Sequence, residues 1–378
     1  MGINNSNKSS EYLHEQQRAA EINLDNKSET EREPWVDFVK VIAIFLVVLL
    51  HSAAPWLYRF GQVSNFDWQI GNIIDSATRV SVPLFFMSTG YLLLNKPVPL
   101  KTYFNKRVRR IVTPWLAWSC IYLVYKSLRS GIPVSISDGI LEFLNGDIYF
   151  HFWFLYALVG LYLFIPIISW FIETDLQKRT LYFLIAWIIT ASVIPFFNTV
   201  TRYTTNYELN IAIDLSMFGG FSGYLIAGLL IGKFKPSKPQ LITIASSCAI
   251  GIILTIAGTS LGTYRLGRLA EYFYEYTAPN VVLAAFAAFI ILKKIGMAIR
   301  QNTKLSYIFE RMGYASLGIY LVHPMILNAL NDGVLSSGLA RTIQTSAFTI
   351  PLVAIVSFFL SYIAVEIISY IPVVRKII

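Results

Sequence analysis

The sequence has few charged residues for its length, and it has few cysteines, the residues that form disulfides or bind zinc in small domains. Charged residues make up 14% of the 378 positions, whereas soluble proteins carry about a quarter. Long apolar runs leave no room for a large soluble domain. The two cysteines, Cys120 and Cys248, both lie within apolar runs, which excludes a disulfide scaffold and a cysteine-based zinc site. We therefore expect no bound metal or cofactor.

Ten continuous apolar runs fill the chain between residues 36 and 371. Each approaches the roughly 20 residues that a helix needs to cross about 30 Å of hydrocarbon. Continuous runs are typical of helices, whereas a membrane barrel would show alternation. We predict an all-α polytopic membrane protein with about ten transmembrane helices, over residues 36–54, 70–94, 111–128, 150–172, 181–198, 211–232, 240–258, 277–295, 313–331 and 345–371.

Charge is distributed unevenly along the chain. Residues 1–34 hold seven acidic and four basic residues and almost nothing apolar, which predicts a disordered tail ahead of one transmembrane domain over 35–378. Loop 95–110 contains six basic residues and no acidic one, so it is predicted to be cytoplasmic, with both termini on that side. The net charge of +9 follows from such loops and does not indicate nucleic-acid binding.

The first two apolar runs each carry a titratable residue at a depth where lipid disfavours it, His51 in the first and Arg79 in the second. His51 is the only such group in the outer half of the first run. It fits a general base or an interfacial histidine that bonds a carbonyl group or water. Arg79 lies about ten residues into the second run, one helical turn after Asp75. It fits an ion pair with Asp75 or an oxyanion-binding site facing His51.

Further polar residues accompany the other runs. The stretch KRVRRIVTPW places four basic residues in five positions, which fits positive-inside topology or a phosphate clamp. His323 precedes a helix-breaking proline and could satisfy a freed carbonyl group. Glu366 is the only carboxylate of the last run. The candidates for a polar cavity are Asp75, His151, Trp153, His323 and Glu366.

Together these elements resemble the acyltransferase-3 family of bacterial integral-membrane O-acyltransferases. The matching segments, in family order, are WVDFVKVIAIFLVVLLH, RVSVPLFFMSTGYLL, the Arg107–Arg110 cluster followed by Pro114, HFWFLYAL and SLGIYLVHP. They extend from residue 35 to residue 324. The family usually has arginine at the position of Lys40, and lysine keeps the charge but loses the bidentate fork.

The resemblance implies a multi-pass enzyme of the bacterial cytoplasmic (inner) membrane, surrounded by membrane lipids. It implies an O-acetyltransferase that takes its acyl group from acetyl-CoA or another cytoplasmic acyl-CoA. The acceptor would be a surface polysaccharide or its lipid-linked glycan precursor. His51 would be the catalytic base, with Arg79 beside it. Acyl-CoA would bind to Lys40, Arg107, Arg109 and Arg110.

A transporter is the alternative from a different functional class. The same polar residues could move a polysaccharide or lipid-linked sugar, with Lys40, Arg79 and Glu366 as gating charges. No internal repeat of the kind found in many transporters is evident in the sequence. Acyl transfer is therefore the favoured interpretation.

Overall fold

The computed structural model describes most of the transmembrane region and leaves out the N-terminal tail. Trp35–Ile378 forms one contact unit. The described residues are 33–94, 100–173, 176–204, 211, 220–334, 345–372 and 374–378, excluding the side chains of residues 106, 108, 109, 172, 173, 176, 204, 333 and 334. The predicted tail, 1–34, lies outside these residues except at its last two positions.

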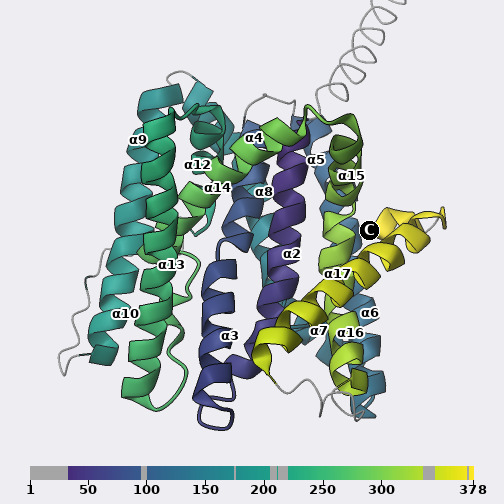
Figure 1. The fold of residues 1–378 in the computed structure, drawn as a ribbon. Coiled ribbons are helices and arrows are strands. Elements are labelled where there is room, and N and C mark those ends of the chain that lie inside the picture. The colour runs from purple at the N-terminus through teal and green to yellow at the C-terminus, as the bar shows by residue number, and fades with distance from the viewer. Residues whose placement is uncertain are drawn as a thin grey trace, which may run out of the picture. The chain divides into compact units, whose positions relative to one another are not determined.

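All regular structure in the described residues is helical, and Figure 1 shows the helices running mostly side by side. Two segments, η1 and η2, are π turns, and two, η3 and η4, are 3₁₀ turns. The elements are α2 (Pro34–Leu57), α3 (Asn65–Thr78), α4 (Ser81–Leu94), α5 (Leu100–Arg107), η1 (Val108–Val112), α6 (Thr113–Ser130), α7 (Ile136–Asn145), α8 (Trp153–Glu173), α9 (Leu176–Trp187), η2 (Ile188–Val193), α10 (Ile194–Thr204), α12 (Ser222–Lys233), α13 (Lys238–Leu266), η3 (Glu271–Phe273), α14 (Pro279–Ile299), α15 (Thr303–Tyr314), α16 (Ser316–Val334), α17 (Ser346–Ser369) and η4 (Val374–Ile377).

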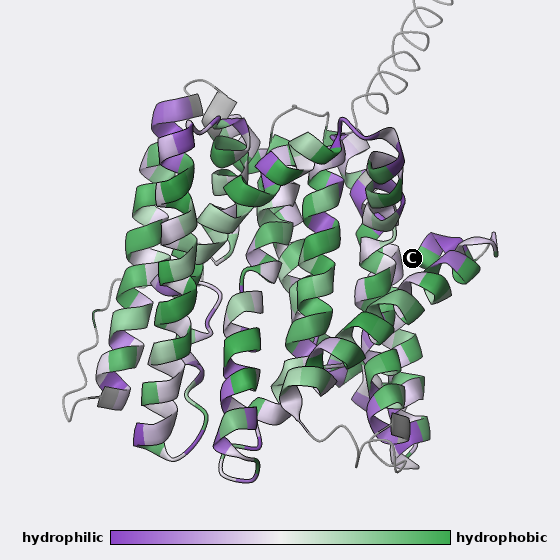
Figure 2. Cartoon of the chain, viewed as in Figure 1, coloured by the Kyte–Doolittle hydropathy of each residue, from purple (hydrophilic) through white to green (hydrophobic). Residues whose placement is uncertain are grey.

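Seven helical segments of the described part are long and apolar enough to cross a membrane: 34–57, 65–94, 153–171, 177–203, 238–266, 279–299 and 346–369. They coincide with seven of the ten predicted spans, so the prediction of a polytopic helical membrane protein is confirmed. Helices α6, α12 and α16 lie at the other three predicted spans without meeting both criteria, and residues 212–219 of the predicted span 211–232 lie outside the described residues. Ten spans and cytoplasmic termini remain predictions. Figure 2 shows the expected distribution, with hydrophilic residues gathered at the two ends of the bundle.

The second predicted span is a broken helix rather than a continuous one. α3 ends at Thr78, Arg79 and Val80 form a turn, and α4 begins at Ser81. The backbone N–H of Leu84 donates to Val80 O at 3.0 Å, which carries the chain into α4. Broken helices in membranes occur where the freed backbone groups are buried in protein. The break places Arg79 between two half-helices, within the bundle.

Helices α4 and α12 approach each other closely because glycines face the contact. A Cβ atom at Gly90 would lie 1.9 Å from Leu225 O, and one at Gly228 would lie 2.0 Å from Met87 O. Small residues allow this backbone proximity in membrane bundles. The contact fixes the position of α4, whose first turn lines the site described below.

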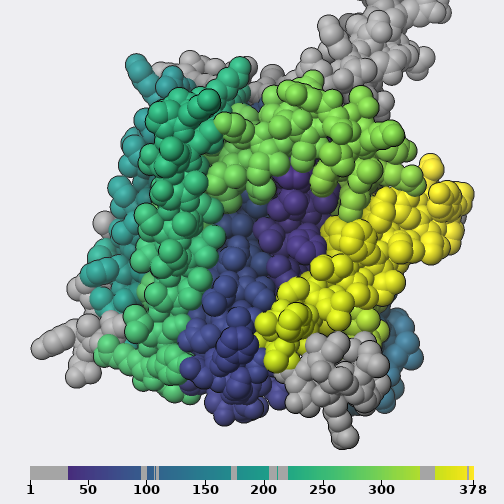
Figure 3. Space-filling model, in the orientation of Figure 1, coloured from purple at the N-terminus to yellow at the C-terminus, as the bar shows by residue number. Residues whose placement is uncertain are grey.

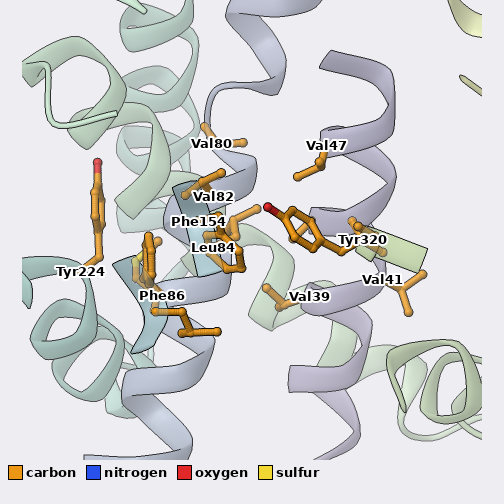
Figure 4. Packing of buried hydrophobic residues seen from close by; sticks show 14 of the residues in the cluster. Val39, Val41, Val47, Val80, Val82, Leu84, Phe86, Phe154, Tyr224 and Tyr320 are labelled. Atoms are coloured by element: carbon orange, nitrogen blue, oxygen red, sulfur yellow. The ribbon is translucent and has the colours of Figure 1, made fainter. Parts of the chain in front are cut away.

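The core gathers around α2 and α4. Figure 4 shows Val47 of α2 facing Val82 of α4, with the Tyr320 side chain between them and its hydroxyl oxygen toward Val82. Phe154 of α8 packs against the same cluster. In Figure 3, α2 forms the floor of a hollow between α3, α14 and α17. The short helices α7 and α15, which the sequence analysis left as loops, lie between longer helices.

Candidate active site

A small cavity lies where α2, α4, α8 and α16 meet the loop before α14. His51, His151 and Trp153 line it, and its volume is about 20 Å³. A space of this size holds about one water molecule. The remaining lining residues are Val47, Leu50, Val82, Phe154, Tyr276 and Tyr320. Three of the polar residues singled out from the sequence therefore meet at one place.

 His51 reaches this cavity from α2. It comes seventeen residues after Pro34, where α2 begins. Its ring is half-buried, with the Phe150 ring 4.9 Å away edge-on and the His323 ring 5.4 Å away at 25°. Neither ring nitrogen has a hydrogen bond to another described residue. The imidazole can therefore accept a proton from a molecule in the cavity.

His323 is held by the backbone of its own helix. Pro324 has no N–H to donate to Tyr320 O, the carbonyl group one turn earlier. His323 Nδ1 lies 2.7 Å from that oxygen and 3.2 Å from Ile319 O. Because both oxygens are acceptors, Nδ1 carries the hydrogen and Nε2 keeps a lone pair. Nε2 is buried without a hydrogen-bond partner in the described part of the chain.

His151 is the third imidazole of the group. Its side chain is 1% exposed, and both ring nitrogens lack partners among the described residues. Its ring centroid is 5.7 Å from that of His323, and its backbone oxygen accepts a hydrogen bond from the Tyr320 hydroxyl. No group of three or more potential ligands in the described residues is arranged to hold a metal ion. The cluster offers ring nitrogens that can accept a proton.

Arg79 forms the ion pair with Asp75 that their spacing allows. Arg79 Nε donates to Asp75 Oδ2 at 2.6 Å, and Nη2 lies 2.5 Å from the same oxygen. Nη1 lies 3.4 Å from Tyr274 O, and the guanidinium group lies 4.2 Å from the Tyr274 ring centroid. The pair makes burial of both charges tolerable. The guanidinium group also lies 5.7 Å from the ring centroid of Tyr276, which lines the cavity together with His51.

The loop 267–278 covers this pair. The Tyr276 ring lies 5.4 Å from the Trp153 ring at 29°, and its backbone oxygen accepts a hydrogen bond from the Tyr224 hydroxyl at 2.5 Å. Desolvation raises the pKa of the Glu275 carboxyl, and the Arg79 guanidinium partly offsets the rise. The loop thus brings an aromatic wall and a carboxylate beside the cavity.

The basic cluster lies elsewhere, around the π turn η1. The Arg107 guanidinium lies 5.7 Å from the ring centroids of Tyr103 and Tyr162, and its Nε is buried without a partner among the described residues. Arg110 is exposed, and the Arg109 side chain lies outside the described residues. π turns are often found at functional sites, and an unpaired buried guanidinium nitrogen could donate to an anion.

Lys40 and Glu366 each form an ion pair. Lys40 Nζ lies 3.7 Å from Asp37 Oδ1 within α2. Glu366 Oε2 lies 2.7 Å from Arg311 Nη2, joining α17 to α15. Glu366 is not among the residues that line the cavity.

Some residues of the site were not singled out from the sequence. Tyr276 and Tyr320 line the cavity, and the alternation of acidic and aromatic residues in EYFYEYT is a signal that could have drawn attention to the first. A Gly-x-Ser-x-Gly sequence also occurs, at Gly258–Gly262. It lies inside α13, so it lacks the strand-to-helix turn of a nucleophile elbow. Its serine, Ser260, instead accepts a hydrogen bond from Asn72 at 2.8 Å.

Comparison with known families connects this geometry to a chemical class. A family model described as an acyltransferase domain, acyltransferase-3, matches residues 33–366. The chain belongs to this family. The matched region contains the whole histidine cluster, the Asp75–Arg79 pair and the basic cluster. Comparisons with curated proteins and with solved structures gave no match.

Membership of the acyltransferase-3 family agrees with the resemblance drawn from the sequence. Together with the seven long apolar helices, it identifies a multi-pass membrane acyltransferase.

Proposed function

 We propose that the protein is an O-acyltransferase of the bacterial inner membrane that moves an acyl group, which we take to be acetyl, from cytoplasmic acyl-CoA to a glycan hydroxyl. The acceptor would be a surface polysaccharide or its lipid-linked precursor. The observation that carries the proposal is the cavity at His51, where an imidazole with no hydrogen-bond partner among the described residues faces enclosed space inside a family-matched acyltransferase domain.

His51 would act as the general base. It takes the proton of an acceptor hydroxyl as the hydroxyl oxygen attacks the thioester carbonyl carbon. The carbon–sulfur bond breaks, the ester forms, and coenzyme A leaves as a thiolate that receives a proton. General-base assistance contributes about 10²–10⁴-fold to such a step. The present cavity holds about one water molecule, so substrates require the aromatic rings of Trp153 and Tyr276 to move aside.

Arg79 would assist through its remaining donors. Its ion pair with Asp75 occupies Nε and one edge of the guanidinium group. Arginine has five N–H donors, so donors are left for the oxygen of the reacting carbonyl group. Asp75 then acts as a positioning residue, since it fixes the guanidinium group beside the turn between α3 and α4.

The acyl donor would bind at the basic cluster. Tyr162, beside Arg107, and Trp153, in the cavity, are nine residues apart on α8. This corresponds to about 14 Å along the helix axis, a distance that an extended pantetheine arm can span. Phosphates of acyl-CoA on Arg107, Arg109 and Arg110 would therefore place the thioester near His51. Lys40, eleven residues before His51, would lie on the donor side.

The acceptor class is proposed from sequence resemblance. The segments RVSVPLFF and His-x-Trp-Phe resemble those of the enterobacterial common antigen O-acetyltransferase, which acts on a surface glycan. Here they begin at Arg79 and His151. His151 lines the cavity, and the Arg79 guanidinium lies 5.7 Å from the ring centroid of Tyr276, which also lines it.

Radiolabelled acetyl-CoA tests this proposal with purified full-length protein and surface glycan stripped of its O-acyl groups by mild base. Label should become attached to the glycan as a base-labile ester. Label that stays on coenzyme A in the presence of a competent glycan would contradict acetyl transfer. A parallel assay with succinyl-CoA tests whether the acyl group is a different one.

Topology can be tested separately. Single cysteines at Asn105 and Gln62, both exposed, would be introduced into a variant lacking Cys120 and Cys248. We expect an impermeant thiol reagent to label Gln62→Cys on whole cells and Asn105→Cys only after lysis. The reverse pattern would place the basic cluster outside, away from cytoplasmic acyl-CoA.

A further inference from the structure

A second and much larger cavity lies at the end of the bundle opposite α5 (Figure 1). It opens between η2 and α10 on one side and the end of α13 with loop 267–278 on the other. Its volume is about 390 Å³, within the range of small-molecule binding sites. The cavity at His51, by contrast, has room for about one water molecule. Of these two cavities, only the larger can hold a sugar unit without rearrangement.

The lining of the larger cavity combines flat aromatic rings with hydrogen-bonding groups. The Tyr203 and Tyr272 rings are stacked at 5.6 Å and 11°, and the Arg268 guanidinium lies 6.0 Å from the Tyr203 ring centroid. Glu271 and Glu275 contribute carboxylates. Aromatic faces suit the C–H faces of a sugar ring, while carboxylates and guanidinium groups bond its hydroxyl groups. Two carboxylates against one guanidinium group disfavour an acidic sugar or a phosphate.

One polar atom in this lining lacks a partner. Ser192 is 1% exposed, and its Oγ has no hydrogen-bond partner among the described residues. Ser192 belongs to the π turn η2, which interrupts the helix formed by α9 and α10. A buried hydroxyl group without a partner costs free energy. A ligand hydroxyl group in the cavity would supply the missing hydrogen bond.

The two cavities share one wall. Glu275 and Thr277 line the larger cavity, whereas Tyr276, between them in sequence, lines the cavity at His51. The Arg79 guanidinium lies 5.7 Å from the Tyr276 ring centroid. The loop around Tyr276 therefore lies between the two cavities, and its rearrangement would connect the larger cavity with His51.

We propose that the larger cavity binds the acceptor, as a sugar unit without acidic groups, and that Tyr276 separates this site from His51 until the acceptor is bound. The proposal rests on the function proposed above and adds the acceptor's position and chemical class. Binding on Tyr203 and Tyr272 places the sugar next to the wall formed by loop 267–278. Displacement of the Tyr276 ring then lets a hydroxyl group reach His51.

Binding of labelled, de-O-acylated surface glycan to the purified full-length protein, without acyl-CoA, tests this site directly. Thr199→Trp fills the cavity and should abolish binding, whereas Phe197→Trp, on an exposed face of the same helix, should not change it. Tyr203→Ala should weaken binding, and Tyr203→Phe, which keeps the ring, should restore it. In the transfer assay, Thr199→Trp should raise the apparent KM for glycan and leave that for acetyl-CoA unchanged.

The two proposals can fail independently. If the wild-type protein acylates glycan and Thr199→Trp leaves glycan binding and its KM unchanged, the acceptor site lies elsewhere while the proposed function stands. If the wild-type protein binds glycan through this cavity but transfers no acyl group to it, the binding site stands and the proposed function fails. Occupation of the cavity by phospholipid alone, measured as lipid released by Thr199→Trp, would overturn the glycan assignment.

Discussion

Helices α2 and α13 are both long and apolar, yet they occupy opposite environments. In the most apolar stretch of α2, 67% of the residues are buried, compared with 17% in α13. Figure 1 shows α2 at the centre of the bundle and α13 at its edge. Hydropathy alone identifies both as membrane helices and says nothing about which one lies inside.

The polar residues of the two helices explain the difference. α2 carries Asp37, Lys40 and His51, which lipid disfavours and which protein must surround. α13 instead buries small and weakly polar residues along one face and exposes large apolar ones on the other. The buried residues are Gly251, Thr255, Thr259, Gly262 and Thr263, and the exposed ones include Ile242, Ile250, Ile253 and Leu261. Small residues allow close helix packing in lipid, where burial of large apolar groups gains little.

The largest expected effect is a loss of acyl transfer when His51 of α2 is replaced in the cavity that it lines. His51→Ala should reduce acyl transfer by about 10²–10⁴-fold, because it removes the proposed base. The measurement is initial rate at saturating acetyl-CoA, with protein amount in the membrane determined in parallel. Ser52→Ala, the adjacent residue, removes only a hydroxyl bonded to Val48 O in the same helix and should retain near-wild-type activity. Comparable activity in both variants would remove His51 from the mechanism.

The next largest effect is expected on the free energy of unfolding, when matched isoleucines in α2 and α13 are replaced. Ile44→Ala in α2 removes a fully buried side chain and leaves a cavity in the packed interior, so we expect it to destabilise the protein by about 2–5 kcal/mol. Ile253→Ala in α13 removes one that is 60% exposed, so its effect should stay within about 0.5 kcal/mol. Thermal unfolding in the same detergent measures both.

Equal destabilisation by these two variants would contradict the assignment of α2 to the interior and α13 to the periphery. The matched chemistry of the two substitutions makes this outcome decisive, because each removes the same atoms from an isoleucine in an apolar helix.

Sequence reasoning located most helices, because hydropathy and length identify long apolar helices directly. It also located His51, His151, Trp153 and His323, which the structure brings together. It could not decide whether Arg79 forms an ion pair with Asp75 or an oxyanion-binding site facing His51. The spacing of the two residues permits the ion pair, but whether it forms depends on the side-chain conformations. It missed the break at Arg79 and Val80 and the contribution of Tyr276 and Tyr320. These depend on contacts between distant segments, such as the 5.4 Å between the rings of His51 and His323, which no local pattern reports.

A smaller effect is expected at the donor side. Arg107→Ala combined with Arg110→Ala should raise the apparent KM for acetyl-CoA by about tenfold or more, since hydrogen bonds to charged groups contribute about 1.5–3 kcal/mol each. The KM for glycan should not change. Arg300→Ala, an exposed basic residue at the end of α14, serves as the matched control. A rise only in the glycan KM would assign the cluster to the acceptor instead.

The smallest effect is expected just before α2, in the polar tail. Deleting residues 1–32 removes acidic and polar residues with no apolar face that could pack on the bundle, and it leaves Pro34 as the start of α2. Activity should change by no more than about twofold, equivalent to the 0.5 kcal/mol typical of surface changes. The assay is the same radiolabel transfer, normalised to the amount of protein in the membrane. A large loss with normal insertion would mean that the central position of α2 depends on the segment before it. The greater burial of α2 than of α13 would then depend on residues 1–32 as well as on the polar residues of α2 itself.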